Sequence, residues 1–152
     1  MLRDRLNDAL KTAIKSKDSL RVSTLRLCNA AIKDRDIAAR SDGNADGVSD
    51  EDVLGILQKM IKQRHDSIRH YEEGGRMELA EREAGEIAVI QEFLPQQMDE
   101  AAIEAAAQAV IAELEAGSLK DMGRTMAALK QRHAGEMDFS KASGIVKGLL
   151  GG

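Results

Sequence analysis

Aromatic residues are scarce in this chain of 152 residues, which has two phenylalanines, one tyrosine and no tryptophan. Strands favour aromatic and β-branched side chains, so the shortage disfavours a sheet-rich core. It also disfavours nucleic-acid binding by base stacking, because stacking needs aromatic platforms. Any contact with a nucleic acid would therefore have to use charge and hydrogen bonds.

Cysteine occurs once, as Cys28, so no disulfide can form within the chain. A chain of this size buries enough surface to fold without one, and a lone cysteine in an apolar run is typical of a small buried side chain in a reducing compartment. The first residues are charged, unlike a signal peptide, and no run reaches the ~18 apolar residues that a membrane span needs. We therefore expect a cytoplasmic protein with no membrane contact.

Alanine, leucine, glutamate, lysine and arginine are abundant, and these residues favour helices. Apolar residues recur at helical spacing along the chain and predict seven helices and no strand. Pro95, the only proline, lacks a backbone donor and restricts Leu94 to an extended shape, which places a boundary there. The expected fold is all-α with two helical subdomains, an N-terminal one at residues 1–95 and a three-helix C-terminal one at residues 96–152.

Several helix ends carry their own signals. Ser49 and Asp52 have the spacing of a capping box, and Asp18 and Asp99 are expected to cap two other helices. Gly74 is expected to take the left-handed conformation just past a helix end. Residues predicted to face the core include Leu2, Leu6, Leu10 and Ile14 in the first helix, Leu20, Leu25, Cys28 and Ile32 in the second, and Ala80, Ala84, Ile87 and Ile90 in the fourth.

Charge is unevenly distributed behind a net charge of −4. The balance is +2 in residues 1–76, −9 in residues 77–116 and +3 in residues 117–152. The acidic middle segment could dock a basic partner, whereas the last segment is locally basic. Within the first two segments, Arg64 and Glu86 are expected to pair between two helices.

One loop imitates a calcium site. Asp42, Asn44 and Asp46 occupy the first, third and fifth positions of an EF-hand loop, but Val53 stands where the bidentate glutamate is needed. A flexible polar loop is the better interpretation. The three histidines lack the spacing of metal ligands on one helix face, so the sequence predicts no metal site, and it predicts no cofactor.

The segment "KDMGRTMAALKQRHAG" is basic and predicts a short helix. Its apolar side is expected to consist of Met122, Met126, Leu129 and His133. Gly123 and Ala127 lie one turn apart and leave a shallow strip beside Arg124, where a phosphate could approach a guanidinium of matching geometry. The alternative is that another helix packs closely against the strip.

Three segments, in this order, resemble the GatB/YqeY family: "LRVSTLRLCNAAIK", "KMIKQRHDSIRHYEEGGRMELAEREAGEIAVIQEFLPQQM" and "KDMGRTMAALKQRHAGEMDFSKASGIVKGLL". The resemblance covers nearly the whole chain, and the last part is similar to the tail of the B subunit of the aminoacyl-tRNA amidotransferase. It implies an all-helical protein of two subdomains. In that complex the chemistry belongs to other parts, and the tail helps to hold the tRNA body.

The resemblance implies an accessory module that binds tRNA or another RNA through its basic C-terminal helices. The family-level label is carbon–nitrogen ligase with glutamine as amide donor, but nothing in this chain matches the catalytic parts, so no catalytic residue is expected. An alternative is a protein-interaction adaptor that uses the acidic segment 77–116, so the candidate partners are tRNA and a protein. The expected RNA-contacting residues are Lys120, Gly123, Arg124, Ala127, Lys130 and Gln131.

Overall fold

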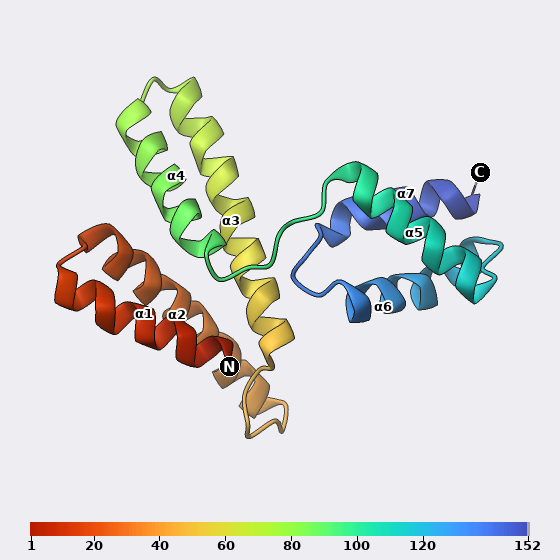
Figure 1. Cartoon of the computed structure of the whole chain (residues 1–152), viewed down its shortest axis with the longest axis horizontal. Helices are drawn as coiled ribbons and strands as arrows, with labels where there is room; N and C mark the ends of the chain where they lie inside the picture. Colours follow the sequence, from red (N-terminus) through yellow and green to blue (C-terminus); the bar gives the residue numbers. More distant parts are fainter. Residues whose placement is uncertain (152) are drawn as a thin grey trace. The chain divides into compact units, whose positions relative to one another are not determined.

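The computed structural model describes residues 1–151, and its regular structure is entirely helical (Figure 1). These residues form seven α-helices, one short 3₁₀ helix and no strand, which confirms the predicted all-α fold. The elements are α1 (Leu2–Ser16), α2 (Ser19–Ser41), α3 (Asp50–Glu73), α4 (Met77–Gln91), α5 (Glu100–Leu114), η1 (Leu119–Asp121), α6 (Met122–Arg132) and α7 (Phe139–Gly151).

The chain forms two compact units, which we call unit 1 (Met1–Pro95) and unit 2 (Gln96–Gly152). Unit 1 contains α1 to α4, and most of its buried apolar residues form one cluster. Unit 2 contains α5 to α7 and has a separate cluster of its own. No helix within residues 1–151 is both long and apolar enough to span a membrane.

Helix starts in unit 1 follow the sequence signals. Asp18 caps α2, and Ser49 and Asp52 form the capping box of α3, as predicted. The start of α1 has no side-chain cap of its own, but the amide of Leu2 donates to Oδ2 of Asp50 at 3.4 Å. This bond joins the first turn of α1 to the first turn of α3.

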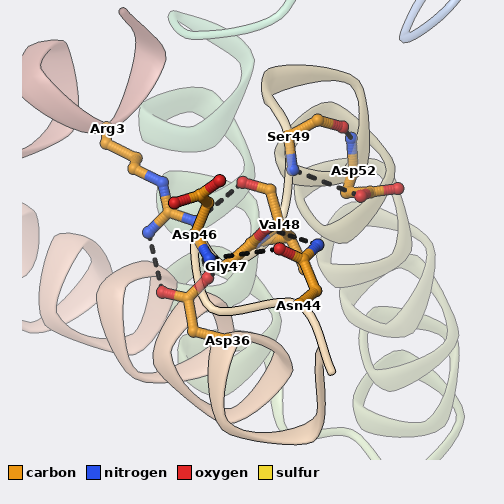
Figure 2. Close-up of polar contacts among 8 residues, drawn as sticks. All are labelled: Arg3, Asp36, Asn44, Asp46, Gly47, Val48, Ser49 and Asp52. Atoms are coloured by element: carbon orange, nitrogen blue, oxygen red, sulfur yellow. Dashed lines mark hydrogen bonds and ion pairs between the residues drawn. The ribbon is translucent and has the colours of Figure 1, made fainter. Parts of the chain in front are cut away.

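The loop between α2 and α3 is anchored at its C-terminal end (Figure 2). The guanidinium of Arg3 donates to both carboxylate oxygens of Asp36, at 2.7 and 2.6 Å, and to the carbonyl of Val48 at 2.9 Å. The amide of Val48 donates back to Asp36 at 2.9 Å, and the intervening Gly47 is buried with φ +82°. The C-terminal end of the loop is therefore bonded to α1 and α2, and the flexibility expected of the loop stays a prediction.

Two residues predicted to face the core do not. A four-residue spacing advances by about 40° per step around a helix, so the stripe drifts, and Ala13 is buried in α1 while Ile14 is 48% exposed. In α4 the face toward α3 includes Glu86, and Ala84 lies about 200° away from it and is exposed. The spacing of apolar residues predicted these two helices correctly, but it assigned Ile14 and Ala84 to the buried face, where they do not lie.

Unit 2 is stabilised by hydrogen bonds between two of its loops as well as by its apolar core. The amide of Met98 donates to the carbonyl of Glu136 at 2.7 Å, and the side-chain amide of Gln97 donates to the carbonyl of Gly135 at 2.6 Å. Asp99 caps α5, as predicted. The buried apolar residues of this unit are Ile103, Ala107, Val110, Leu129, Met137, Ala142, Val146 and Leu150.

Candidate nucleic-acid interface

All six residues predicted to contact RNA are exposed. We call them the α6 strip: Lys120, Gly123, Arg124, Ala127, Lys130 and Gln131. Lys120 lies in η1, and the five residues on α6 span about 120° of its circumference at 100° per residue. The opposite side of α6 is held in the core by Thr125 and Leu129, which are fully buried. The structure thus gathers the predicted α6 residues on one open side of the helix.

Gly123 has no packing role within residues 1–151. A Cβ atom at this position would meet no heavy atom within 4 Å beyond its own helix backbone and adjacent residues. A helical glycine costs roughly 1 kcal/mol relative to alanine, and no contact in the described chain requires it. The packing interpretation of the strip therefore has no counterpart inside unit 2.

Arg124 is held along one edge by Asp121. Its Nε donates to Oδ1 of Asp121 at 3.0 Å, while its Nη atoms make no hydrogen bond within residues 1–151. The other carboxylate oxygen accepts from the amides of Gly117 at 2.9 Å and Ser118 at 3.4 Å. The Gly117 bond, together with Arg124, holds the pKa of Asp121 below its usual range, so the carboxylate stays charged at neutral pH.

The other basic residues near the strip differ in their freedom. Lys120 and Lys130 are exposed and form no ion pair within the described chain. Arg132 donates from Nη1 to Oε2 of Glu113 on α5 at 2.5 Å. This bond lowers the pKa of Glu113 and raises that of Arg132. Arg132 therefore braces α5 against α6, and the two lysines remain open to a ligand.

A second pattern on α7 was missed from the sequence. Residues 121–131 and 138–148 match in exposure at every position, and in residue type at several, at an offset of 17 residues. The matched pairs are Asp121 and Asp138, Gly123 and Ser140, Arg124 and Lys141, Ala127 and Gly144, Lys130 and Lys147, and Gln131 and Gly148. Self-comparison at this offset would have revealed it. The match supplies equivalent positions in the same unit for control variants.

The acidic segment 77–116 is not one surface of either unit. It is divided between α4 in unit 1 and α5 in unit 2. Several of its carboxylates are already paired with arginines: Glu86 with Arg64, Glu92 with Arg21, and Glu113 with Arg132. These pairs reduce the charge that the segment can offer to a basic partner.

The calcium-like loop uses its polar groups internally. Oδ1 of Asn44 accepts from the amide of Asp46 at 3.1 Å, and its Nδ2 donates to the carbonyl of Gly47 at 2.9 Å (Figure 2). Within residues 1–151, no three histidine, cysteine or acidic side chains are grouped to hold a metal ion. The arrangement stabilises a turn.

Fold and surface together define an all-α protein of two compact helical units, the second of which exposes a cationic helix face around an open glycine. The model of the YqeY-like protein family matches residues 3–150. The chain therefore belongs to the YqeY-like protein family, as its sequence segments indicated.

Curated relatives share the name "Altered inheritance of mitochondria protein 41, mitochondrial". The relative from Vanderwaltozyma polyspora is 37% identical over 102 residues, which are 62% of this chain and 52% of the relative. The one from Lachancea thermotolerans is 33% identical over 111 residues, or 72% and 57% of the two chains. The one from Kluyveromyces lactis is 36% identical over 89 residues, or 58% and 45%. The chain spans about half the length of these relatives.

The expected cytoplasmic location is contradicted by this comparison, because the matched relatives are named as mitochondrial proteins. The expectation rested on charged first residues, the lack of a long apolar run and a single cysteine. Those features argue against secretion and disulfide bonding. They do not distinguish the cytoplasm from other reducing compartments, so the inference went too far.

Proposed function

We propose that this protein is an RNA-binding accessory module that holds tRNA by its phosphate backbone, using the α6 strip. The observation that carries the proposal is the open Gly123 beside Arg124, whose Nη atoms have no partner within residues 1–151. The resemblance of the C-terminal segment to the tail of the amidotransferase B subunit supports tRNA as the RNA. Amide transfer lies outside the proposal, because the sequence matches none of the catalytic parts.

The geometry suits a phosphate for two reasons. A glycine on an exposed helix face lets a bulky backbone come close, and a guanidinium offers a planar fork of donors that matches phosphate oxygens. Lys120 and Lys130 add two unpaired charges beside them. Because the chain as a whole carries −4, affinity should be modest and should fall steeply with salt.

The test is binding of the purified protein to bulk tRNA across a salt series, with duplex DNA of equal length as the comparison. We expect preferential tRNA binding, and we expect Arg124→Ala with Lys130→Ala to reduce the salt slope by roughly two units. The matched control is Lys141→Ala with Lys147→Ala, which removes the same charge at equivalent positions of α7. Its effect should be clearly smaller.

Two outcomes would count against the proposal. Equal losses in the two double variants would mean that binding is spread over unit 2 and is not centred on α6. No tRNA binding by the wild-type protein at about 50 mM salt would remove the RNA function altogether. Capture of a protein partner would then test the adaptor alternative, which the paired carboxylates of segment 77–116 favour less.

A further inference from the structure

We infer that Asp121 is a positioning residue of the α6 strip, which fixes Arg124 so that its two Nη groups face an incoming phosphate. The inference rests on the proposed function, since it concerns how the same strip would bind RNA. It assigns a role in phosphate binding to a carboxylate, the residue type that simple charge arguments would exclude from such a site.

The carboxylate is itself immobilised. Oδ2 of Asp121 accepts from the backbone amides of Gly117 and Ser118, at 2.9 and 3.4 Å, in the turn that precedes η1. Oδ1 is left for Nε of Arg124 at 3.0 Å. The side chain of Asp121 is 24% exposed and that of Arg124 is 51% exposed, so a half-buried carboxylate holds an exposed guanidinium. Rotation of the guanidinium about the Cδ–Nε bond is thereby restrained.

The bond from the amide of Ser118 belongs to a capping box at the start of η1. The equivalent residue of α7 shows what Asp121 does beyond capping. Asp138 accepts from the amides of Ser140 at 2.9 Å and Lys141 at 3.3 Å, both in the first turn of its own helix. Asp121 makes no such bond to α6. It bonds backward to the preceding turn and forward to the side chain of Arg124. Both aspartates therefore accept amides at a helix start, and Asp121 in addition holds the side chain of Arg124.

Positioning and net charge predict opposite effects of neutralising Asp121. A carboxylate within one screening length of bound phosphates repels them, so charge alone predicts that Asp121→Asn strengthens RNA binding. A pre-ordered arginine loses less side-chain freedom on binding, so loss of the anchor should weaken binding. From the usual cost of immobilising one long side chain, the expected weakening is roughly threefold to tenfold.

The experiment measures tRNA affinity of the full chain as wild type, Asp121→Asn, Arg124→Gln and the double variant, at about 0.1 M salt. We expect Asp121→Asn to weaken binding in the wild-type background and to have no such effect when Arg124 is already glutamine. Asp138→Asn is the matched control, because it removes the same charge at the equivalent position of α7. It should leave binding unchanged or slightly tighter.

Each outcome of these affinity measurements supports or overturns the positioning role of Asp121. Tighter or unchanged binding by Asp121→Asn, in a wild type that binds tRNA, overturns the inference and leaves the proposed function standing. A weakening that persists in the Arg124→Gln background assigns Asp121 a structural role and also overturns the inference. A wild-type protein that fails to bind tRNA overturns the proposed function and this inference together. Thermal unfolding of every variant checks that the fold is retained.

Discussion

Arg64 on α3 donates from Nε to Oε2 of Glu86 on α4 at 2.9 Å, and the two side chains are only 13% and 10% exposed. The pairing confirms the expectation drawn from the sequence. Nη1 of Arg64 also donates to the carbonyl of Met60 at 3.2 Å, so the guanidinium is bonded on two sides. This largely covered pair braces the two helices of unit 1 that make the most extensive contact with each other.

Removing one partner of this pair should be costly. Arg64→Ala leaves the carboxylate of Glu86 covered and without its main partner, which should lower the free energy of unfolding by about 3 kcal/mol and Tm by on the order of 10 °C. Thermal unfolding followed by circular dichroism measures this. Arg69→Ala is the control, because Arg69 pairs with Asp66 on the exposed surface and should change stability by less than about 1 kcal/mol. Equal melting temperatures for the two variants would rule out the brace.

The contact between Arg3 and Asp36 should make unit 1 sensitive to acid. The hydrogen bond from Arg3, and then the one from the amide of Val48, hold the pKa of Asp36 far below its usual value of about 3.9. A carboxyl whose folded-state pKa is depressed stabilises the fold above the unfolded pKa, and this stability is lost as pH falls toward the folded pKa. Urea midpoints should therefore fall below about pH 4 more steeply in the wild type than in Asp36→Asn. The exposed Asp34→Asn should keep the wild-type slope, and identical slopes in all three proteins would contradict the prediction.

Alanine substitutions at two loop glycines distinguish the cost of backbone strain from the cost of a steric clash. Gly43 and Gly47 both have positive φ, at +93° and +82°, so either alanine substitution should cost about 1 kcal/mol. At Gly47 the new Cβ would also lie 2.5 Å from Oδ1 of Asp36, whereas at Gly43 it would meet nothing within 4 Å. Gly47→Ala should thus lose clearly more stability in chemical unfolding than Gly43→Ala. A similar loss for both would mean that the loop yields without disturbing Asp36.

Stability and RNA binding should move in opposite directions at Gly123. Alanine there should stabilise α6 by about 0.5 to 1 kcal/mol, because the glycine is helical and contacts nothing that a methyl group would displace. The same methyl group should weaken tRNA binding by keeping the phosphate backbone away. Gly55→Ala in α3 is the matched control, since its Cβ also meets nothing within 4 Å. It should gain similar stability with no change in binding, and unaltered binding by Gly123→Ala would remove this position from the interface.

Cys28 should report the opening of unit 1. The thiol is fully buried, and burial raises its pKa to about 11, so the reactive thiolate is scarce at pH 8. A thiol-labelling reagent should therefore react slowly with the native protein and rapidly after addition of urea. Fast labelling without denaturant would show that the helices around Cys28 open readily. Because the chain has a single cysteine, the signal needs no further substitution.

The inner face of α6 shows where sequence patterns were too coarse. The wheel predicted Met122, Met126, Leu129 and His133 inside; Leu129 is buried and both methionines pack against the core, but the fully buried Thr125 was not predicted. Threonine was counted as polar, although its methyl group and small size allow it into a helix core. The residues of the α6 strip are exposed, as the wheel indicated for this side of the helix, and their role in RNA binding stays a prediction.

Helix ends show the second limit of sequence reasoning. Gly74 was expected to be left-handed, but its φ is −88° and Gly75 has φ +73°. Two adjacent glycines can both adopt that conformation, so the sequence cannot specify which one does. Helix α5 ends at Leu114, and Glu115, which is not a glycine, is left-handed with φ +53°. Caps made by side chains, such as Asp99, were predictable because they depend on a specific hydrogen-bond acceptor.

The separate cores of the two units have a consequence for how the chain tolerates variation. The buried cluster from Leu2 to Phe93 and the cluster from Ile103 to Leu150 share no residue. A damaging substitution in one cluster removes packing energy from that cluster alone. We therefore expect a core substitution in unit 1 to leave the packing of the unit 2 cluster intact, and the reverse for a core substitution in unit 2.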